Sequence, residues 1–428
     1  MIYTEAVSYT HSLQEFGSRP GLDRISLLLD RIGNPQNRLR FIHIAGTNGK
    51  GSVTAYCASI LREAGYKTGM FISPYVVDFR ERFQIDGQFI SEEEFAEILS
   101  MLVPHIEALR QEGTIITEFE AITALAFVYF LHNHCDIVCL EVGLGGTYDS
   151  TNVIPMPEAA VIMSIGYDHM KVLGRTLEEI TLQKAGIIKK GCQVISYPLQ
   201  KEEVLTFLLR RTAELQARLI LPNTGSVRIR ELNIRGSSFT YGGESFFTPL
   251  AGEHQVYNAV TAIETVRNLP HFPVPEEAIR KGLAQTRFPA RFEVLSEKPL
   301  VILDGGHNPD CAQTVRQALS MLPGIRKVAV MGMMADKDYR QVLEILAGSL
   351  DAVVTTSVQN PRVLPPEDLC EAARDYISNA YAEPDHTAAL AQARALAGED
   401  GLVLICGSLY LAEEIRPLFT EKGSDKPV

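Results

Sequence analysis

The 428-residue sequence predicts an α/β fold, in which a mainly parallel sheet domain with a glycine-rich loop is followed by a smaller, Rossmann-like α/β domain. Short apolar runs alternate with amphipathic stretches along the chain, which is the pattern of repeated strand–helix units. Most of these runs are continuously apolar, as in strands that are buried on both faces of a sheet. The length also exceeds that of one ordinary domain, so we expect at least two.

The first domain is expected over residues 1–288. Its predicted strands are Phe41–Ala45, Lys67–Ile72, Ile137–Leu140 and Ala159–Ile165. Its predicted helices are Ser52–Ala64, Ser91–Gln111 and Glu118–Asn133. Between Leu219 and Leu250, short alternating segments with Gly-Ser and Gly-Gly turns predict a hairpin insertion.

The second domain is expected over residues 289–428, after a hinge at Gln285–Ala290. Its predicted strands are Phe292–Leu295, Leu300–Leu303, Lys327–Val330, Ala352–Thr355 and Leu402–Ile405. The polar tail after Glu421 is expected to be disordered.

Composition narrows the function classes. The net charge of −12 argues against a general nucleic-acid binder, because phosphate backbones favour basic surfaces. The seven cysteines form no C-x-x-C pair and are expected to be reduced thiols. The amino terminus has no signal-peptide pattern, and the longest apolar run, Ala121 to Leu131, is shorter than the ~20 residues that span a bilayer. We therefore expect a cytoplasmic protein without membrane partners.

The strongest local motif is a glycine-rich loop between the first strand and its helix, Gly46-Thr47-Asn48-Gly49-Lys50-Gly51-Ser52. Glycines allow backbone N–H groups to converge on phosphate oxygens, and the following helix terminus adds positive potential. Lys50 would neutralise phosphate charge, and Ser52 could reach a phosphate or Mg²⁺. The fit to the general P-loop pattern is imperfect, because Gly51 separates the lysine from Ser52. The alternative is a glycine-rich turn with a surface lysine.

Acidic and imidazole side chains follow two other predicted strands. Glu141 ends the strand after Asp136, and His169 follows the strand that ends near Ile165. Because the carboxyl ends of parallel strands meet at one edge, both could lie near the glycine-rich loop, where Glu141 could hold Mg²⁺. A paired strand-end glutamate and a solvated histidine are the structural alternatives. For Lys184 the pattern alone indicates only a surface lysine.

The segment Thr117-Glu118-Phe119-Glu120 precedes an apolar helix with the spacing of a capping box. In this motif Thr117 caps the helix and Glu120 reaches back to the cap residue. This structural role explains the pattern without a ligand.

Taken together, the motifs resemble the folylpolyglutamate synthase / dihydrofolate synthase family, which is related to the Mur peptide ligases. The resemblance covers nearly the whole chain. Its motifs are Tyr3–Ala6, Ile25–Leu28, His43–Ser52, Ser73-Pro74, Thr117–Glu120, Glu141–Gly146, Asp168-His169, Lys184–Ile187, His254–Ala259, Pro289–Arg291, Asp304–Pro309 and Gly407–Leu411.

The resemblance implies a magnesium-dependent ligase that uses ATP as co-substrate, with a monovalent cation as an open addition. The implied ATP-binding residues are Asn48, Gly49, Lys50, Gly51, Ser52, Asn258, Arg291, Asp304 and His307. Ser73, Glu141 and His169 are the implied metal ligands, and Lys184 matches a lysine that is carbamylated in the family. Thr117, Glu118, Phe119, Glu120 and Asp149 match the part that holds the pterin substrate. Lys50, His169 and the modified Lys184 are the residues expected to support catalysis.

The family resemblance also implies the reaction and the substrates. A carboxylate would attack the γ-phosphorus of ATP, and the amine of L-glutamate would displace phosphate from the acyl phosphate to form an amide. The carboxylate substrate is a reduced folate, dihydropteroate or both, and we expect a monomer. Two rivals remain open at this stage: a Mur-type amino-acid ligase acting on a cell-wall precursor, and a nucleotide switch without ligation.

Three departures from the family pattern concern the pterin side. The family usually has Arg-Leu-Asp where this chain has Thr147-Tyr148-Asp149, so a cationic contact is missing. Tyr75 stands in place of the usual histidine after Ser73-Pro74, and Ala290 replaces a glycine before Arg291. The phosphate and metal residues are intact.

Overall fold

The computed structural model describes residues 1–16 and 20–419, so the tail that we expect to be disordered lies outside the described residues. The large domain is built on an eight-stranded sheet with the order β4-β3-β2-β5-β1-β6-β7-β8. Its strands are β1 (Phe41–Ala45), β2 (Thr68–Phe71), β3 (Phe83–Ile85), β4 (Gln88–Phe89), β5 (Ile137–Glu141), β6 (Ala159–Ile162), β7 (Gln193–Ser196) and β8 (Arg218–Ile220). Neighbouring strands pair in parallel along the part of the sheet that runs β2-β5-β1-β6-β7-β8. Strands β3 and β4 extend the sheet beyond β2 as an antiparallel edge.

Helices cover both faces of this sheet, as the continuously apolar strands predict. Ile42 and Ile44 of β1 pack toward α3 (Lys50–Glu63), α9 (Glu253–Arg267) and α10 (Glu276–Gln285). On the opposite face, Phe41 joins the core formed with α1 (Tyr3–Ser12), α2 (Asp23–Arg31), α4 (Glu92–Gln111) and α5 (Glu118–His132). A neighbouring core on that face packs under α6 (Met170–Leu173), α7 (Leu177–Lys184) and α8 (Glu202–Glu214).

The predicted insertion between Leu219 and Leu250 is a three-stranded antiparallel sheet, one strand larger than a hairpin. Its strands are β9 (Arg228–Asn233), β10 (Gly236–Tyr241) and β11 (Glu244–Thr248). Phe239 and Phe246 point into the core shared with α9, so this small sheet is part of the large domain.

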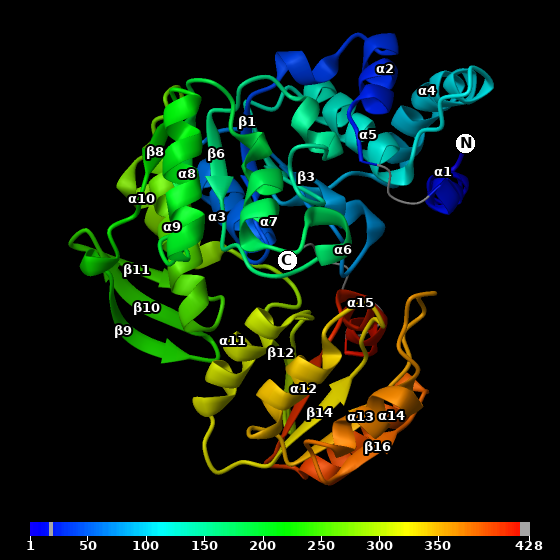
Figure 1. Ribbon diagram of the computed structural model, residues 1–428, viewed down its shortest axis with the longest axis vertical. Helices are drawn as coiled ribbons and strands as arrows, with labels where there is room; N and C mark the ends of the chain where they lie inside the picture. The colour runs from blue at the N-terminus through cyan, green and yellow to red at the C-terminus, as the bar shows by residue number, and fades with distance from the viewer. Residues whose placement is uncertain (17–19, 420–428) are drawn as a thin grey trace.

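The second domain contains a six-stranded sheet in the order β12-β13-β17-β14-β15-β16, lying below the large domain in Figure 1. Its strands are β12 (Glu293–Glu297), β13 (Leu300–Leu303), β14 (Lys327–Met331), β15 (Ala352–Thr355), β16 (Ala380–Ala382) and β17 (Leu402–Cys406). All neighbours pair in parallel except β12, which forms an antiparallel edge with β13. Its helices are α11 (Pro309–Ser320), α12 (Tyr339–Ala347), α13 (Pro366–Arg374), α14 (His386–Ala397) and α15 (Leu409–Ile415).

The connection between the two sheets lies close to the glycine-rich loop. Helix α10 ends at Gln285, and β12 of the second sheet begins at Glu293. Within the connection, the ring of Phe288 fills the space beside Gly51, where an added Cβ would come within 2.6 Å of the ring. The predicted boundary between residues 288 and 289 falls in this connection and stays a prediction.

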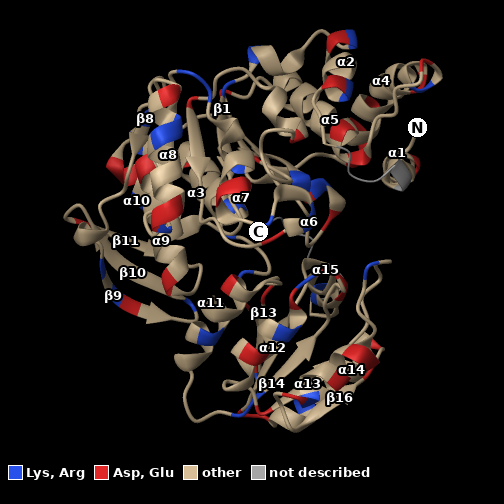
Figure 2. Cartoon of the chain, in the orientation of Figure 1, with Lys and Arg blue, Asp and Glu red and all other residues tan. Residues whose placement is uncertain are grey.

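Charged residues of both signs are interspersed over the two domains (Figure 2), which fits a chain with 40 basic and 52 acidic side chains. Within residues 1–16 and 20–419, no helix is both long and apolar enough to cross a membrane.

Candidate functional site

The glycine-rich loop joins the buried strand β1 to the 14-residue helix α3. Gly49 precedes the helix with φ +84°, a conformation that favours glycine. At Gly46 a side chain would overlap Met163, because an added Cβ would lie 2.5 Å from the Met163 Cβ. The amides of Thr47 and Asn48 donate to the Ser164 carbonyl at 2.8 and 3.4 Å, which ties the loop to the segment after β6. The loop is therefore a tight turn at a helix N-terminus, a geometry suited to phosphate oxygens.

Two lysines converge on the carbonyl of Gly46. Lys50 Nζ lies 3.2 Å from this oxygen and 3.3 Å from that of Thr47, and Lys184 Nζ lies 2.8 Å from the Gly46 oxygen. Lys184 ends α7 and is buried, so the expectation of a surface lysine from the local pattern is wrong. Burial, together with the charge of Lys50, lowers the pKa of Lys184 to about 7. A large fraction of this amine is consequently neutral near neutral pH.

Glu141, at the end of β5, is a buried carboxylate beside the same loop. It is 5% exposed, and its Oε2 accepts a hydrogen bond from the Ser73 amide at 3.2 Å. An added Cβ on Gly51 would lie 3.4 Å from Glu141 Oε2, so the carboxylate lies against the first turn of α3. Burial raises the pKa of Glu141, and the positive charge of Lys50 opposes this shift.

Asp168 and His169 follow β6 at the same carboxyl edge and face the second domain. Asp168 Oδ1 accepts a hydrogen bond from Lys337 Nζ at 2.7 Å, and both side chains are only 10% exposed. Asp168 Oδ2 lies 3.5 Å from His307 Nε2 and accepts from Asn308 Nδ2 at 3.4 Å. Burial alone would raise the pKa of Asp168, but these partners and His169 hold it well below its usual range. Burial also lowers the pKa of His169 to about 4, against the opposing charge of Asp168.

The glycine-rich loop itself contacts the second domain. Asn48 Oδ1 accepts hydrogen bonds from Asn308 Nδ2 at 3.0 Å and from Cys311 Sγ at 3.3 Å. These two residues belong to the start of α11, so the loop and this helix meet across the seam between the domains.

The predicted nucleotide residues of the second domain gather near this contact. Asp304, at the end of β13, accepts the amides of Phe292 at 3.0 Å and Gly306 at 2.8 Å. Burial raises the pKa of Asp304, while the charge of Arg291 opposes the shift. Arg291 lies 5.2 Å over the ring of Phe288 in the connection between the domains.

Asn258, on α9, approaches the loop from the large domain. An added Cβ on Gly49 would lie 2.8 Å from Asn258 Oδ1. Asn258 Nδ2 donates to Gln255 Oε1 at 3.1 Å, and Gln255 Nε2 donates to Ser52 Oγ at 3.3 Å. The motif around Asn258 therefore supports the loop at Gly49 and, through Gln255, at Ser52.

The Thr117–Glu120 segment forms the predicted capping box at the start of α5. Glu120 Oε2 accepts the Thr117 amide at 2.8 Å, and Glu120 also pairs with Arg24 at 2.9 Å. Phe119 packs against Gly143, where an added Cβ would lie 2.5 Å from the ring. Glu120 is thus committed to the fold, and a pterin contact by this segment stays a prediction.

Asp149 is likewise held by its own loop. Its carboxylate accepts the amides of Leu144 at 2.8 Å and Thr151 at 3.0 Å, and burial raises its pKa. The departure residue Thr147 donates its hydroxyl to the Gln183 carbonyl at 3.1 Å, so it packs against α7. Asp149 therefore shapes the Gly143–Gly146 turn, and its predicted contact with a pterin is untested.

The oxygen ligands predicted for Mg²⁺ fit that ion. Ser73 and Glu141 are adjacent, and magnesium prefers hard oxygen ligands. Glu141 accepts a main-chain N–H, and no ion pair within 4.0 Å joins it to a cation of the described chain. A bound cation would offset this buried negative charge. Within residues 1–16 and 20–419, no three or more His, Cys, Asp and Glu side chains are grouped so that they could hold a metal ion.

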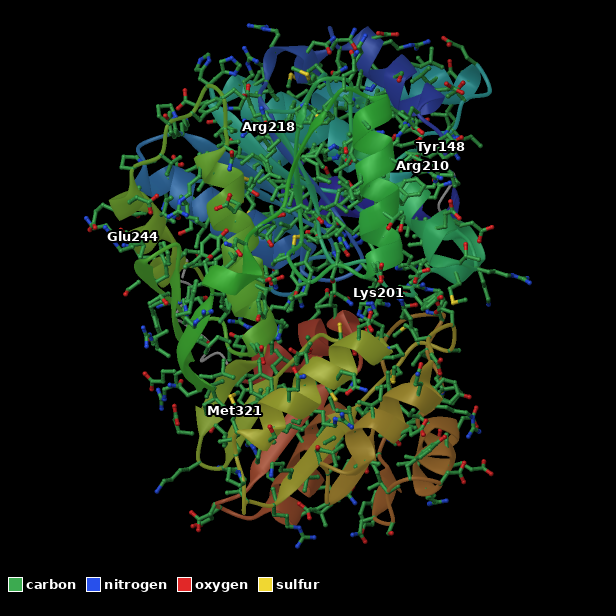
Figure 3. All side chains as sticks on the ribbon, turned by 60° about the vertical axis from the view of Figure 1, so that its left-hand side comes forward. Tyr148, Lys201, Arg210, Arg218, Glu244 and Met321 are labelled. Atoms are coloured by element: carbon green, nitrogen blue, oxygen red, sulfur yellow. The ribbon has the colours of Figure 1, made fainter. Side chains whose placement is uncertain are left out.

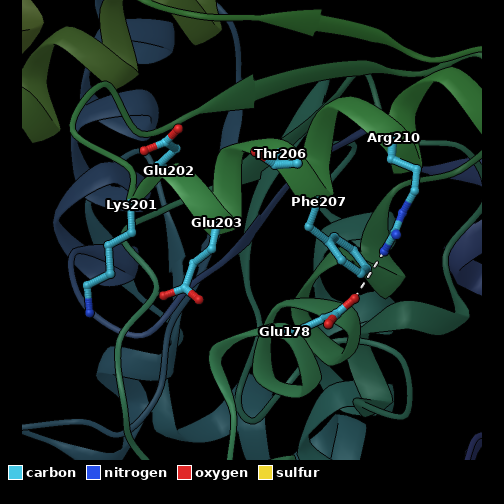
Figure 4. A pocket seen from close by; sticks show the side chains of 7 residues that line it. All are labelled: Glu178, Lys201, Glu202, Glu203, Thr206, Phe207 and Arg210. Carbon is cyan, nitrogen blue, oxygen red and sulfur yellow. Dashed lines mark hydrogen bonds and ion pairs between the residues drawn. The ribbon is translucent and has the colours of Figure 1, made fainter.

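A separate surface pocket lies outside the predicted site residues. This pocket of about 590 Å³ lies on α7 and α8, and Figure 4 shows its lining side chains, which are Glu178, Lys201, Glu202, Glu203, Thr206, Phe207 and Arg210. None of them is a predicted site residue. Its Glu178–Arg210 pair is exposed, and Lys201 lies at the end of α8 that faces the second domain (Figure 3).

Sequence reasoning missed Lys337 and did not single out Asn308. Lys337 lies in the loop between β14 and α12. The rule that residues at carboxyl strand ends share one edge could have identified Lys337, but only with the strand order of the second sheet known.

Two family models match the chain. The Mur ligase middle domain matches residues 44–266, and the Mur ligase glutamate ligase domain matches residues 290–409. Among curated relatives, the dihydrofolate synthase/folylpolyglutamate synthase of Bacillus subtilis is 37% identical, covering 97% of this chain and 98% of the relative. The folylpolyglutamate synthase of Lacticaseibacillus casei is 34% identical with the same two coverages.

Solved structures agree with these relatives. A Mycobacterium tuberculosis folylpolyglutamate synthase complexed with ADP and AMPPCP superposes with a TM-score of 0.91 and 30% identity, over 98% of this chain and 99% of that one. The Escherichia coli enzyme FolC in complex with DHPP and ADP gives 0.85 and 30%, over 96% and 97%. The prediction from the sequence motifs is confirmed: the chain belongs to the folylpolyglutamate synthase / dihydrofolate synthase family of Mur ligases.

Proposed function

We propose that this protein is an ATP-dependent ligase that joins L-glutamate to a folate, to dihydropteroate or to both through an acyl phosphate. The observation that carries the proposal is the seam itself. Asn48 of the glycine-rich loop forms a hydrogen bond with Asn308 of the second domain. The amines of Lys50 and Lys184 converge on the same loop. A nucleotide in this seam would contact both domains at once.

The ATP-binding set comes from both sides of the seam. The loop residues Asn48 to Ser52 would hold the phosphates through main-chain N–H groups and the Lys50 ammonium. Asn258 would support the loop, and Arg291, Asp304 and His307 would contact the nucleotide from the second domain. Arg291 lies in the connection between the domains, and His307 lies just before α11, which supports the assignment of these residues to the nucleotide.

Magnesium would be held by Ser73, Glu141 and His169, and when bound it would neutralise charge on the phosphates. The buried Glu141 carboxylate supports the assignment. Lys184 suits the predicted carbamate because its pKa of about 7 leaves a neutral amine available to react with carbon dioxide. The carbamate would replace a buried amine by an anion beside the glycine-rich loop, where it could face the proposed magnesium ion.

The proposed reaction needs no covalent bond between the protein and a substrate. A carboxylate oxygen of the folate attacks the γ-phosphorus, ADP leaves, and the acyl phosphate then has phosphate as its leaving group. The amine of glutamate attacks the acyl carbon, and phosphate departs as the amide forms and the amine loses a proton. Lys50 and Arg291 would offset developing charge, while the closed domains exclude water from the acyl phosphate.

The carboxylate substrate would lie along the Thr117–Glu120 segment and the turn that Asp149 shapes. Phe119, packed on Gly143, supports an aromatic surface for the pterin side. Thr147 and Tyr148 stand in place of the family's Arg-Leu, so a cationic contact with the substrate is lost at this position. We therefore expect the affinity for the carboxylate substrate to depend less on negative charge near Thr147.

Product analysis tests the proposal directly. ATP, Mg²⁺ and L-glutamate are incubated with dihydropteroate or with tetrahydrofolate, and mass spectrometry follows the addition of one glutamate residue together with ADP. Ligation of either substrate is the expected result. Neither product, with a cell-wall precursor accepted instead, would contradict it.

A further inference from the structure

The segment Ala290-Arg291-Phe292, at the end of the connection between the domains, has an unusual backbone conformation. Ala290 has φ +54° and Phe292 has φ +52°, so two residues with side chains lie in the left-handed region on either side of Arg291. A β-carbon disfavours this region, which glycine adopts freely. Such a conformation persists only where its surroundings fix it, and it is typical of functional sites.

Packing fixes the two flanking side chains and leaves the arginine between them at the seam. Ala290 is buried in the core on one face of the second sheet, and Phe292 in the core on the opposite face. Arg291 is partly exposed, and its Nη1 donates to the Ala290 carbonyl at 3.0 Å. Within residues 1–16 and 20–419, no carboxylate forms an ion pair with Arg291 within 4.0 Å. The segment therefore presents a cation whose charge is available to a ligand.

Two carboxylates hold the main chain of the segment. Glu293 Oε2 accepts the Ala290 amide at 2.9 Å, and Asp304 Oδ2 accepts the Phe292 amide at 3.0 Å. The Ala290 carbonyl accepts the Gly305 amide at 2.9 Å. The amide of each left-handed residue thus depends on a side-chain acceptor, and Glu293 is the acceptor that the sequence motifs did not single out.

Arg416, directly after α15, fixes the position of the Glu293 carboxylate. Its Nε lies 3.1 Å from each Glu293 oxygen, and its Nη2 lies 2.8 Å from Oε1. The two side chains are only 15% and 23% exposed, so this two-pronged ion pair is largely shielded from water. Because one oxygen of the pair also accepts the Ala290 amide, the ion pair determines where that acceptor lies.

The ion pair lies close to the large domain. Glu81, in the turn before β3, is buried, and its Oε2 accepts two main-chain amides at 2.9 and 2.8 Å. Burial raises the pKa of Glu81, whereas those amides and the charges of Arg416 and Arg291 oppose the shift. Both arginines are therefore within electrostatic range of the large domain. Glu293 neutralises Arg416, which leaves the charge of Arg291 for the seam.

We propose that Glu293 and Arg416 are a positioning pair that keeps Ala290 in the left-handed conformation and thereby directs the Arg291 guanidinium toward the nucleotide. The inference rests on the proposed function, because Arg291 is there a nucleotide contact. Without the carboxylate, Ala290 would be free to adopt a negative φ, and the guanidinium would leave the seam. Neither Glu293 nor Arg416 needs to touch a substrate for this role.

Calorimetric titration of ADP and Mg²⁺ into single and double variants tests the pair. In Glu293→Ala, Kd for ADP should rise about tenfold, which is about 1.4 kcal/mol and comparable to the cost of the left-handed conformation for alanine. Adding Ala290→Gly to Glu293→Ala should recover most of the affinity, because glycine adopts φ +54° without the carboxylate. The melting temperature should stay low in both, since Arg416 still lacks its partner.

The separation between affinity and stability distinguishes positioning from a merely structural role. A structural role would lower the melting temperature without changing Kd for ADP, and the added glycine would restore nothing. Either result would overturn the positioning pair. Arg416→Lys keeps the charge and loses the second prong, so it guards against misfolding and should give a smaller rise in Kd.

Glu297→Ala is the matched control and should bind ADP like the wild-type protein. Glu297 lies on the same strand, β12, and forms an exposed pair with Arg235 at 2.7 Å. Arg291→Met separates the two claims. If it weakens ADP binding and Glu293→Ala does not, only the positioning pair fails. If the wild-type protein does not bind ADP, the proposed function itself fails.

Discussion

Lys50 is a site residue whose contacts contribute little to the stability of the fold. Within residues 1–16 and 20–419, its ammonium bonds only the carbonyls of Gly46 and Thr47, which belong to its own loop. Removing it should therefore leave the fold intact. In Lys50→Ala we expect amide formation to fall by about a hundred- to a thousandfold, the usual effect of losing one group that stabilises transition-state charge.

Steady-state kinetics and circular dichroism together check this expectation. Lys281→Ala is a suitable control, because Lys281 is an exposed residue of α10 that pairs with Glu277 on the surface of the same helix. Near-normal ligation by Lys50→Ala would contradict the assigned role.

The amine of Lys184 gives a prediction with a definite sign in pH. Because its pKa is lowered to about 7, the ammonium form dominates below that pH and the neutral amine above it. A carbamate forms only from the neutral amine, so its population should increase between roughly pH 6 and pH 8. Carbon-13 NMR with labelled bicarbonate would show a carbamate signal that Lys184→Gln lacks. Full activity at pH 8 without such a signal would rule out the carbamate.

At the scale of elements, the close packing of α3 against α10 depends on a single small residue. An added Cβ on Gly282 would lie 2.4 Å from the Ile60 Cα, which is main chain and cannot move without its helix. Gly282→Ala should therefore destabilise the protein by about 1–3 kcal/mol, as overpacking generally does.

Thermal melting of Gly282→Ala beside Gly348→Ala measures this effect. Gly348 follows α12, and an added Cβ there would meet nothing within 4 Å. Equal melting temperatures for the two variants would contradict the packing argument.

The sequence predicted the long, strongly apolar elements well. Strand β1 has the predicted limits, and the capping box at Thr117 placed the start of α5 correctly. The short strands β3, β4, β8 and β16 were not predicted, because two or three residues carry no usable periodicity and are fixed by their neighbours. The four-residue strand β7 was not predicted either.

The same limit applies to the site. The glycine-rich loop is local and was identified from its own residues, whereas Lys184 became notable only through the family resemblance. Its burial depends on contacts 138 residues apart in the chain.

For the whole molecule, the Asp168–Lys337 pair is the most direct charged link across the seam. Both partners are largely buried, so removing one leaves the other short of a counter-charge. Lys337→Met should lower turnover by weakening closure, with less effect on the stability of either domain. Asp168→Asn combined with Lys337→Met should cost less than the sum of the single changes.

Small-angle scattering with ADP and Mg²⁺ would report the degree of closure, and kinetics of the four proteins would complete the cycle. Exposed Arg340, paired with Asp375 on the outside of the second domain, offers Arg340→Met as a control. Strict additivity in the cycle would show that Asp168 and Lys337 act independently.

The ring of Phe288 occupies an unusual place, since it belongs to the interdomain connection and yet rests on Gly51 and beneath Arg291. The predicted hinge at Gln285–Ala290 would consequently place the pivot next to the glycine-rich loop and not at the far rim of the seam. Parts close to a pivot travel little when it turns, so the loop and Arg291 would keep their spacing throughout a catalytic cycle. The parts of the two domains far from Phe288 would move most when the domains open. Amino acids and products could then exchange there while ATP stays bound at the glycine-rich loop.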